Sequence, residues 1–233
     1  MQLEDIRDAI RGIDDHFPVT KLIGLENTHN VCGGAPLSVA YTKEVADLAR
    51  SHNIKVHIDG ARIFNAAVAL GVDVQDLVED ADSMSFCMSK GLAAPVGSII
   101  CGSKDFIDQA RGIRKGLGGG MRQAGIIAAA GIVALETMVD RLQEDHTNAR
   151  LLANGIADLP GVVLDPETIK TNIIYFDMDD NAIESADFLT VLAAKGIQFF
   201  DTGPRQFRMV THYGITAEDI LYTINSFKET LTN

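Results

Sequence analysis

Three charged side chains in the first half of the sequence lie where strands are expected to end. Asp59 and Arg62 belong to the stretch HIDGARIFNA, which follows the apolar run at residues 55–59. Lys90 follows a second apolar run and has small neighbours in SKGLAAP. Each alone has a common explanation, because aspartate often forms turns and lysine and arginine usually lie in solvent. Together they supply a carboxylate, a guanidinium and an amine at the edge where open parallel sheets bind ligands.

An aldehyde cofactor uses this combination of groups. A lysine amine in a mostly apolar pocket has a lowered pKa and can form an imine with pyridoxal phosphate. A carboxylate opposite the ring nitrogen keeps that nitrogen protonated, so that the ring accepts electrons. An arginine can hold a substrate carboxylate in a bidentate fork. The sequence therefore predicts that Lys90 binds the cofactor aldehyde.

The elements that must position these residues follow from the apolar pattern. Short runs rich in strand-forming residues occur at 21–27, 55–59, 83–88 and 97–102, and helical patterns lie between them. Strands joined by helical crossovers predict an α/β fold with a mostly parallel sheet and helices on both faces. The connection between the last two strands is short, so an antiparallel pair is also open there. We further expect an amphipathic helix over residues 1–15 and a short helix over 74–81.

The second half of the sequence is typical of a separate α+β domain. A helical pattern runs from Ala124 to about Leu159 and is expected to form two helices that meet near residues 137–140. Strand, helix, strand, strand and helix are expected after it. We place the boundary near Val139, which gives a cofactor-binding domain at 1–138 and a C-terminal small domain at 139–233.

Composition restricts the class of partner. The chain has 233 residues, of which 46% are hydrophobic, and a formal net charge of -12. Such a charge argues against nucleic acid and against an anionic membrane surface. No apolar run reaches the roughly 20 residues that span a bilayer. The three cysteines and six histidines show no metal-ligand spacing. We therefore expect a cytoplasmic protein with a small-molecule substrate and no metal site.

Four motifs, LENTHN, HIDGARIFNA, SKGLAAPVGS and RKGLGGGMRQ, occur in this order along nearly the whole chain. In order and spacing they resemble the low-specificity L-threonine aldolases, which are β-eliminating lyases of the fold-type I pyridoxal-phosphate class. The resemblance implies that Lys90 binds the cofactor aldehyde and that Asp59 pairs with the pyridinium. Arg62 would contact both the cofactor and the substrate carboxylate.

The resemblance also assigns residues outside that group. His16, in DDHFPVTKLIG, matches a histidine near the substrate hydroxyl and is the expected catalytic base, with a water as the alternative. Arg208, in FRMVTH, would supply a second carboxylate contact. Arg122 would bind the cofactor and Lys115 the substrate, in the pocket of a neighbouring subunit. By themselves, basic residues beside three glycines form a solvated face or a flexible loop, and a histidine ahead of a strand is an ordinary polar residue.

The implied reaction is the cleavage of L-threonine or L-allo-threonine, β-hydroxy amino acids, to glycine and acetaldehyde. The implied assembly is a homodimer or homotetramer. Family members carry a longer N-terminal portion that holds the turn for the cofactor phosphate, so we expect the large domain to be truncated here. Two alternatives stay open. The chain is an inactive truncated or split-enzyme fragment that acts only as an assembly partner, or it is another pyridoxal-phosphate-dependent lyase or transferase.

Overall fold

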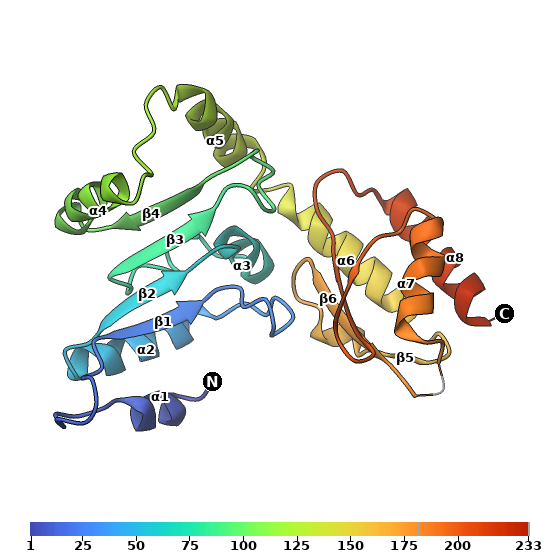
Figure 1. Cartoon of the computed structure of the whole chain (residues 1–233), viewed down its shortest axis with the longest axis horizontal. Helices are drawn as coiled ribbons and strands as arrows, with labels where there is room; N and C mark the ends of the chain where they lie inside the picture. Colours follow the sequence, from blue (N-terminus) through green and yellow to red (C-terminus); the bar gives the residue numbers. More distant parts are fainter. Residues whose placement is uncertain (181, 233) are drawn as a thin grey trace. The chain divides into compact units, whose positions relative to one another are not determined.

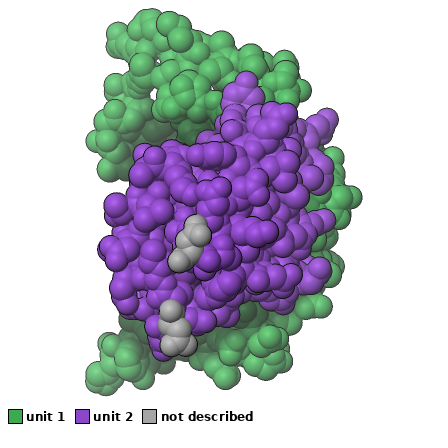
Figure 2. All heavy atoms as spheres, turned by 90° about the vertical axis from the view of Figure 1, so that its right-hand side faces the viewer, with its two compact units in different colours: residues 1–28, 37–139 green, residues 29–36, 140–233 purple. Residues whose placement is uncertain are grey.

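The computed structural model describes residues 1–180 and 182–232 and divides the chain into two compact units (Figures 1 and 2). Unit 1 comprises residues 1–28 and 37–139, and unit 2 comprises residues 29–36 and 140–233. The chain therefore passes into unit 2 after Thr28, returns to unit 1 at Leu37, and passes into unit 2 again after Val139. The sequence pattern does not indicate that residues 29–36 belong to unit 2.

Unit 1 is built on a sheet with the strand order β1 (Leu22–Glu26), β2 (Lys55–Asp59), β3 (Ser83–Cys87) and β4 (Ser98–Gly102). The first three strands are parallel, whereas β4 pairs antiparallel with β3. The expected mostly parallel sheet is confirmed, and the short connection between the last two strands forms the antiparallel pair. Alternate positions of β1, β2 and β3 are buried, as in Ile58 of β2, which is 1% exposed, whereas alternate positions of β4 are only half-buried.

Five helices accompany this sheet among the described residues of unit 1: α1 (Leu3–Ala9), α2 (Val39–Ser51), α3 (Ile63–Leu70), α4 (Lys104–Gly116) and α5 (Gly125–Thr137). The crossover helix α2 packs against β2, and α4 packs against β4. Helix α2 begins after Ser38, whose hydroxyl accepts a hydrogen bond from the Tyr41 amide at 3.2 Å. Helix α3 ends at Gly71, which adopts the left-handed conformation with φ 66°.

The helix expected over residues 74–81 is wrong, because this segment forms successive turns. The Asp73 carboxylate accepts a hydrogen bond from the Gln75 amide at 2.8 Å and starts the first turn. The Asp76, Val78 and Ala81 amides each donate to the carbonyl three positions back, so the segment is a series of turns and not a continuous helix. Leu77 is nevertheless fully buried, which explains the helix-like apolar spacing of the segment.

The N-terminal helix is shorter than expected. It ends at Ala9, because Ile10 adopts an extended conformation with φ -71° and ψ 115°. Ile6 is 5% exposed and packs as expected, but Ile13 is 96% exposed. Gly12, which lowers the helical preference of this stretch, comes two positions after Ile10. The amphipathic pattern therefore holds for about two turns and not for all of residues 1–15.

Unit 2 contains an antiparallel sheet with the strand order β5 (Val162–Val163), β6 (Ile173–Met178), β8 (Gln206–Val210) and β7 (Phe200–Gly203). Its helices are α6 (Leu142–Ile156), α7 (Ser185–Ala194) and α8 (Ala217–Thr232), and a single 3₁₀ turn, η1, spans Pro166–Thr168. Helices α5 and α6 are the two that the sequence predicts between residues 124 and 159. No helix among the described residues has the length and apolar content needed to cross a membrane.

The core of unit 2 lies between one face of this sheet and the three helices. Aromatic rings dominate it: Phe176 and Phe207 stack with centroids 5.2 Å apart, and Phe188 and Phe227 meet edge to face at the same distance. All four side chains are at most 2% exposed. Such packing holds β6 and β8 rigidly, so a side chain on the other face of these strands has a fixed point of attachment.

Candidate active site

The carboxyl ends of β1, β2 and β3 bring together the residues for which the sequence predicts chemistry. The strand register places Glu26 beside Asp59, and Asp59 beside Ser85. The backbone stays paired past the end of β2, because the Asn27 amide donates to the Asp59 carbonyl at 2.9 Å and the Gly60 amide donates to the Ser85 carbonyl at 2.7 Å. Asp59 therefore stands on a well-ordered edge in the middle of the three strands.

The Asp59 side chain is exposed and is tied to the turn that follows it. Its Oδ1 accepts a hydrogen bond from the Ala61 amide at 3.1 Å. Oδ2 has no hydrogen-bond partner in the part of the chain that the structure describes. Gly60 is required at the turn, because a Cβ there would lie 2.9 Å from the Ser85 carbonyl oxygen and 2.9 Å from Ile63 Cβ. One carboxylate oxygen is thus fixed, while the other makes no hydrogen bond to a described residue.

Arg62 lies at the N-terminal end of α3. It occupies the N-cap position with φ -128° and ψ 34°, and its carbonyl accepts a hydrogen bond from the Ala66 amide at 3.2 Å. The side chain is half-buried. Because the turn at Gly60 is tight, α3 begins directly after β2. Asp59 and Arg62 therefore both lie at the carboxyl end of β2.

Lys90 lies in the loop that follows β3. The loop is closed by amide hydrogen bonds from Ala93 to the Lys90 carbonyl at 2.9 Å and from Ala94 to the Met88 carbonyl at 3.0 Å. Gly91 and Leu92 are buried, whereas the Lys90 side chain is exposed. Its amine makes no hydrogen bond or ion pair with any described residue. The loop is therefore held by its backbone, and the amine is available to react.

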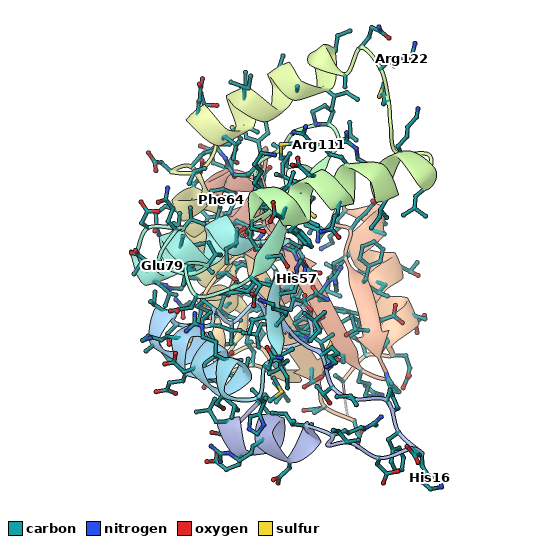
Figure 3. The ribbon with its side chains drawn as sticks, turned by 90° about the vertical axis from the view of Figure 1, so that its left-hand side faces the viewer. His16, His57, Phe64, Glu79, Arg111 and Arg122 are labelled. Atoms are coloured by element: carbon teal, nitrogen blue, oxygen red, sulfur yellow. The ribbon has the colours of Figure 1, made fainter. Side chains whose placement is uncertain are left out.

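His16 is separate from this group. It lies on an exposed loop that leads into the amino end of β1, and Figure 3 shows it well apart from His57 on β2. Its Nδ1 is 3.0 Å from Asp14 Oδ1. Hydrogen bonds from the His16 amide and ring hold the pKa of Asp14 below its usual value. His57 is half-buried, and its Nδ1 lies 2.8 Å from the Ser83 hydroxyl, which ties β2 to β3.

Lys115, in the last turn of α4, and Arg122 are both exposed, and Figure 3 shows Arg122 on the connection between α4 and α5. The chain folds back at the end of α4, since the Gly119 amide donates to the Arg114 carbonyl at 2.8 Å. Gly118 has φ 85°, and a Cβ at Gly120 would collide with the Lys115 side chain. The glycines therefore let the chain turn back sharply at the end of α4, and the Lys115 side chain packs against Gly120.

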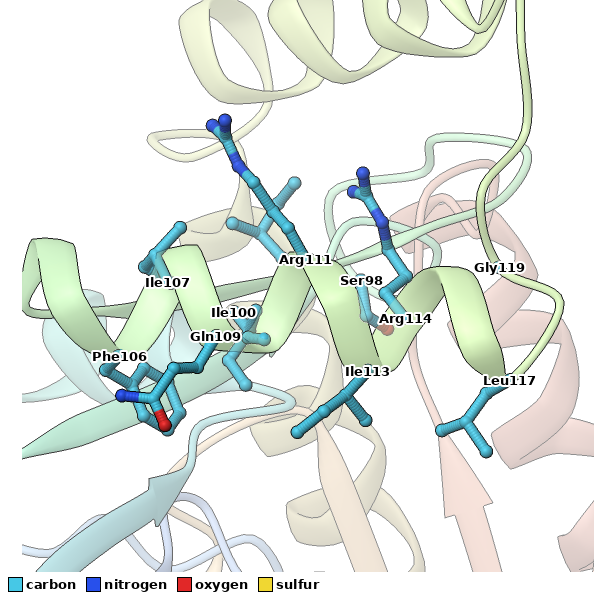
Figure 4. A pocket seen from close by; sticks show the side chains of 12 residues that line it. Ser98, Ile100, Phe106, Ile107, Gln109, Arg111, Ile113, Arg114, Leu117 and Gly119 are labelled. Atoms are coloured by element: carbon cyan, nitrogen blue, oxygen red, sulfur yellow. The ribbon is translucent and has the colours of Figure 1, made fainter.

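A groove of about 720 Å³ lies between β4 and α4. Its apolar lining includes Ile100, Phe106, Ile113 and Leu117. Figure 4 shows Ile113 and Leu117 on one side of α4 and the guanidinium groups of Arg111 and Arg114 on the other. None of Asp59, Arg62 and Lys90 lines this groove. The apolar hollow and the reactive groups of unit 1 are therefore distinct features.

Arg208 lies in unit 2, on β8 opposite Tyr175 of β6. Its Nη1 donates a hydrogen bond to Asn30 Oδ1 at 3.1 Å, and Asn30 Nδ2 lies 3.4 Å from the Tyr175 hydroxyl. Sequence reasoning did not single out Asn30 or Tyr175. The available signal was the motif LENTHN, whose last residue is Asn30. Across residues 1–180 and 182–232, no group of three or more His, Cys, Asp or Glu is arranged to hold a metal ion.

Comparison with known proteins supplies the family. The model of the beta-eliminating lyase family matches residues 1–179. The chain is 46% identical over 234 residues to low-specificity L-threonine aldolase 1 of Arabidopsis thaliana, a match that covers 99% of this chain and 65% of the relative. It is 39% identical to the low specificity L-threonine aldolase of Escherichia coli strain K12, covering 94% of this chain and 63% of the relative.

Solved structures show the same fold. The Leishmania major threonine aldolase superposes with a TM-score of 0.80 at 14% identity, covering 99% of this chain and 67% of that one. A PLP-dependent aminotransferase from Streptococcus suis 89-1591 gives a TM-score of 0.74 at 18% identity, covering 99% and 61%. The chain thus spans slightly less than two thirds of the curated relatives that it matches. The expected fold-type I architecture and the resemblance indicated by the four motifs are confirmed, and the chain belongs to the beta-eliminating lyase family.

Proposed function

We propose that this chain provides the catalytic groups of a pyridoxal-phosphate-dependent carbon–carbon lyase of the threonine aldolase type. Its reaction is the cleavage of L-threonine or L-allo-threonine to glycine and acetaldehyde. The observation that carries the proposal is the gathering of Asp59, Arg62 and Lys90 at one edge of the parallel sheet. It is supported by the 46% identity to a low-specificity L-threonine aldolase over 99% of the chain.

The donor set at this edge suits pyridoxal phosphate. Lys90 has an exposed amine for the aldehyde, and Asp59 has one carboxylate oxygen, Oδ2, that makes no bond to a described residue. When bound, this cofactor draws electrons away from the Cα of an amino acid, which weakens the bonds at that carbon. Asp59 holds a proton at the ring nitrogen, because an ionised carboxylate favours the charged form of a base beside it.

The remaining residues bind the substrate and move its proton. Arg62 binds both the cofactor and the substrate carboxylate, and Arg208 binds that carboxylate from the small domain. His16 is the proposed base for the β-hydroxyl proton on the strength of the sequence resemblance, and not of its position, which is separate from the other groups. Removal of this proton is needed before the carbonyl of acetaldehyde can form.

The proposed organisation has a cofactor-binding domain at residues 1–138 and a small domain at 139–233. The proposed assembly is a homodimer or homotetramer in which Arg122 reaches the cofactor and Lys115 the substrate of a neighbouring subunit. Both side chains are exposed, as such a role requires. A cytoplasmic location is proposed because Cys32, Cys87 and Cys101 are all free thiols, which suits a reducing compartment.

The test is to measure acetaldehyde released from L-threonine and L-allo-threonine with added pyridoxal phosphate. Lys90→Arg should abolish release, because a guanidinium keeps the positive charge but cannot react with the aldehyde. Lys104→Arg is the matched control, since Lys104 is exposed on α4 and forms an ion pair with Asp108. Equal activity of Lys90→Arg and the unmodified chain would refute the proposal.

A further inference from the structure

Residues 29–36 lie on the face of the unit 2 sheet that points away from its aromatic core. Phe207 and Met209 of β8 belong to the core, so Arg208 between them points to the opposite face. The same alternation on β6 places Ile174 and Phe176 in the core and Tyr175 beside Arg208. The face with Tyr175 and Arg208 is therefore the one that the segment covers.

Two contacts fix the far end of this segment. The Thr171 hydroxyl donates a hydrogen bond to the Gly34 carbonyl at 2.8 Å. Gly34 has φ 71°, and a Cβ there would lie only 3.2 Å from the nearest carbon of Ile173. Ile173 is fully buried although it lies outside the aromatic core, because the segment covers it. Residues 29–36, which we call the strap, are therefore packed against unit 2, and the strap holds Asn30 over β6 and β8.

Asn30 uses both ends of its amide on this face. Its Oδ1 accepts the hydrogen bond from Arg208 Nη1 at 3.1 Å, and its Nδ2 lies 3.4 Å from the Tyr175 hydroxyl. The contact to Tyr175 orients the amide so that its oxygen faces the guanidinium. Among the described residues, the hydrogen bond from the Arg208 guanidinium goes to Asn30.

The contact leaves one edge of the guanidinium open. A guanidinium has two edges suited to a carboxylate: the pair of Nη atoms, and the side formed by Nε and one Nη. The bond to Asn30 occupies Nη1. Arg208 Nε is buried and has no hydrogen-bond partner among the described residues. A buried donor without a partner is costly, so a ligand that supplies an acceptor there is bound more tightly.

We propose that Asn30 is a positioning residue that holds Arg208 so that a substrate carboxylate is bound through Nε and the adjacent Nη2. This inference rests on the proposed function, in which Arg208 binds the substrate carboxylate. Asn30 acts through its hydrogen bond to the guanidinium. A neutral amide is suited to this role, because a carboxylate at residue 30 would pair with Arg208 and compete with the substrate.

The experiment follows the Arg208 Nε–H signal by ¹⁵N–¹H NMR, assigned by its loss in Arg208→Lys. The full chain is titrated with L-threonine and, in parallel, with 1-amino-2-propanol, which is threonine without its carboxylate. L-threonine should shift the signal and 1-amino-2-propanol should not. Asn30→Asp should weaken L-threonine binding by about tenfold to a hundredfold, the range for losing a charge-assisted hydrogen bond. Asn30→Ala should weaken it less, and Tyr175→Phe less again.

Asn154→Asp is the matched control, because Asn154 is exposed on α6 of the same unit and the change in charge is identical. It should leave both titrations unchanged. The inference is overturned if L-threonine leaves the Nε–H signal unmoved, or if Asn30→Asp and Asn154→Asp bind L-threonine equally well. Because the readout is binding, a chain that binds L-threonine at Arg208 without cleaving it would refute the proposed function and leave the inference standing. If Asn30→Asp cleaved L-threonine with an unchanged KM, the proposed function would stand and the inference would be refuted.

Discussion

The amine of Lys90 is independent of the bonds that hold its loop. The backbone of Met88, Lys90, Ala93 and Ala94 closes the loop, and the side chain makes no bond to a described residue. Removal of the side chain should therefore leave the loop intact, and a loss of function on substitution would report chemistry rather than folding.

Borohydride reduction in the presence of pyridoxal phosphate, followed by peptide mass mapping, should place the pyridoxyl group on Lys90. Lys104 and Lys115 serve as internal comparisons, because both are exposed lysines of α4. Lys90→Ala should lose the label while its circular dichroism spectrum stays unchanged. Labelling of Lys104 or Lys115 in preference to Lys90 would contradict the assignment.

Asp59 has a turn contact through one oxygen, and this permits a clean substitution. Asp59→Asn keeps the acceptor for the Ala61 amide but removes the charge. We expect the cofactor still to bind and the turnover number to fall by several orders of magnitude, each factor of ten corresponding to about 1.4 kcal/mol of lost transition-state stabilisation. Asp73→Asn is the control, since Asp73 makes the same kind of turn with Gln75. Equal turnover in the two variants would reduce Asp59 to a turn residue.

His146 in α6 makes the stability of the chain depend on pH. The side chain is 3% exposed, and burial lowers its pKa to about 4 from an ordinary value near 6.5. Its folded-state pKa lies below the unfolded one, so its contribution is complete above about pH 6.5 and is lost as the pH falls towards 4. The shift corresponds to about 3 kcal/mol at most.

Urea unfolding at pH 7, 5.5 and 4.5 should therefore show a steep fall in the free energy of unfolding that His146→Asn reduces. Burial raises the pKa of the neighbouring Asp145, a change that acts in the opposite direction in the acid range, so the comparison between variants is the informative one. His52→Asn, at an exposed position, is the control. Identical pH dependence in the two variants would exclude His146 as the cause.

At the scale of elements, periodicity predicts those whose apolar side chains face a single core. The strands at residues 55–59 and 83–88 and the helices on either side of residues 137–140 belong to this class. Periodicity fails over residues 74–81, because the Asp76, Val78 and Ala81 amides donate to carbonyls three positions back and form turns in place of a continuous helix. It also fails for residues 29–36, whose partners are 137 and 178 positions away in sequence and leave no local pattern.

The candidate site divides in the same way. Asp59, Arg62 and Lys90 could be grouped from sequence, because strand ends of one parallel sheet share an edge. The contact of Asn30 with Arg208 could not, because it depends on which face of a second sheet a loop covers. The motif LENTHN alone does not indicate which face of the unit 2 sheet residues 29–36 cover.

The turn between β2 and α3 depends on the absence of a side chain at Gly60. Gly60→Ala should lower the free energy of unfolding by about 1–3 kcal/mol, because the new Cβ would press on Ser85 and Ile63. Gly112→Ala is the matched control with the opposite sign. Gly112 lies in α4, and a Cβ added there would have open space within 4 Å, so alanine should stabilise by about 0.5–1 kcal/mol. Urea unfolding of both variants measures the difference, and two changes of the same sign would contradict the argument.

On the scale of the whole molecule, several large apolar side chains of unit 1 are exposed. Helix α4 contains no buried residue, and Leu117 and Ile126 are 83% and 87% exposed. Helix α5 is apolar on all sides, which is typical of a helix enclosed by other elements. Exposed apolar side chains that gather in a patch promote association.

The chain alone should therefore associate with increasing concentration in sedimentation velocity and should bind an apolar dye. The double substitution Ile113→Gln with Leu117→Gln should reduce both effects, because both side chains line the groove between β4 and α4. Leu221→Gln, at a 51% exposed position of α8, is the control. A concentration-independent monomer, or an equal effect of the control, would show that the groove does not drive association.

The strap at residues 29–36 has a consequence for the order in which the protein can be made. A ribosome releases Asn30 178 residues before Arg208, and Gly34 137 residues before Thr171. Until the last third of the chain emerges, the strap has no surface on which to settle. The carboxyl-terminal portion expressed by itself would likewise lack the cover of Ile173. The second unit can therefore be completed only after nearly all of the polypeptide exists, and it cannot be excised from the chain with a single cut.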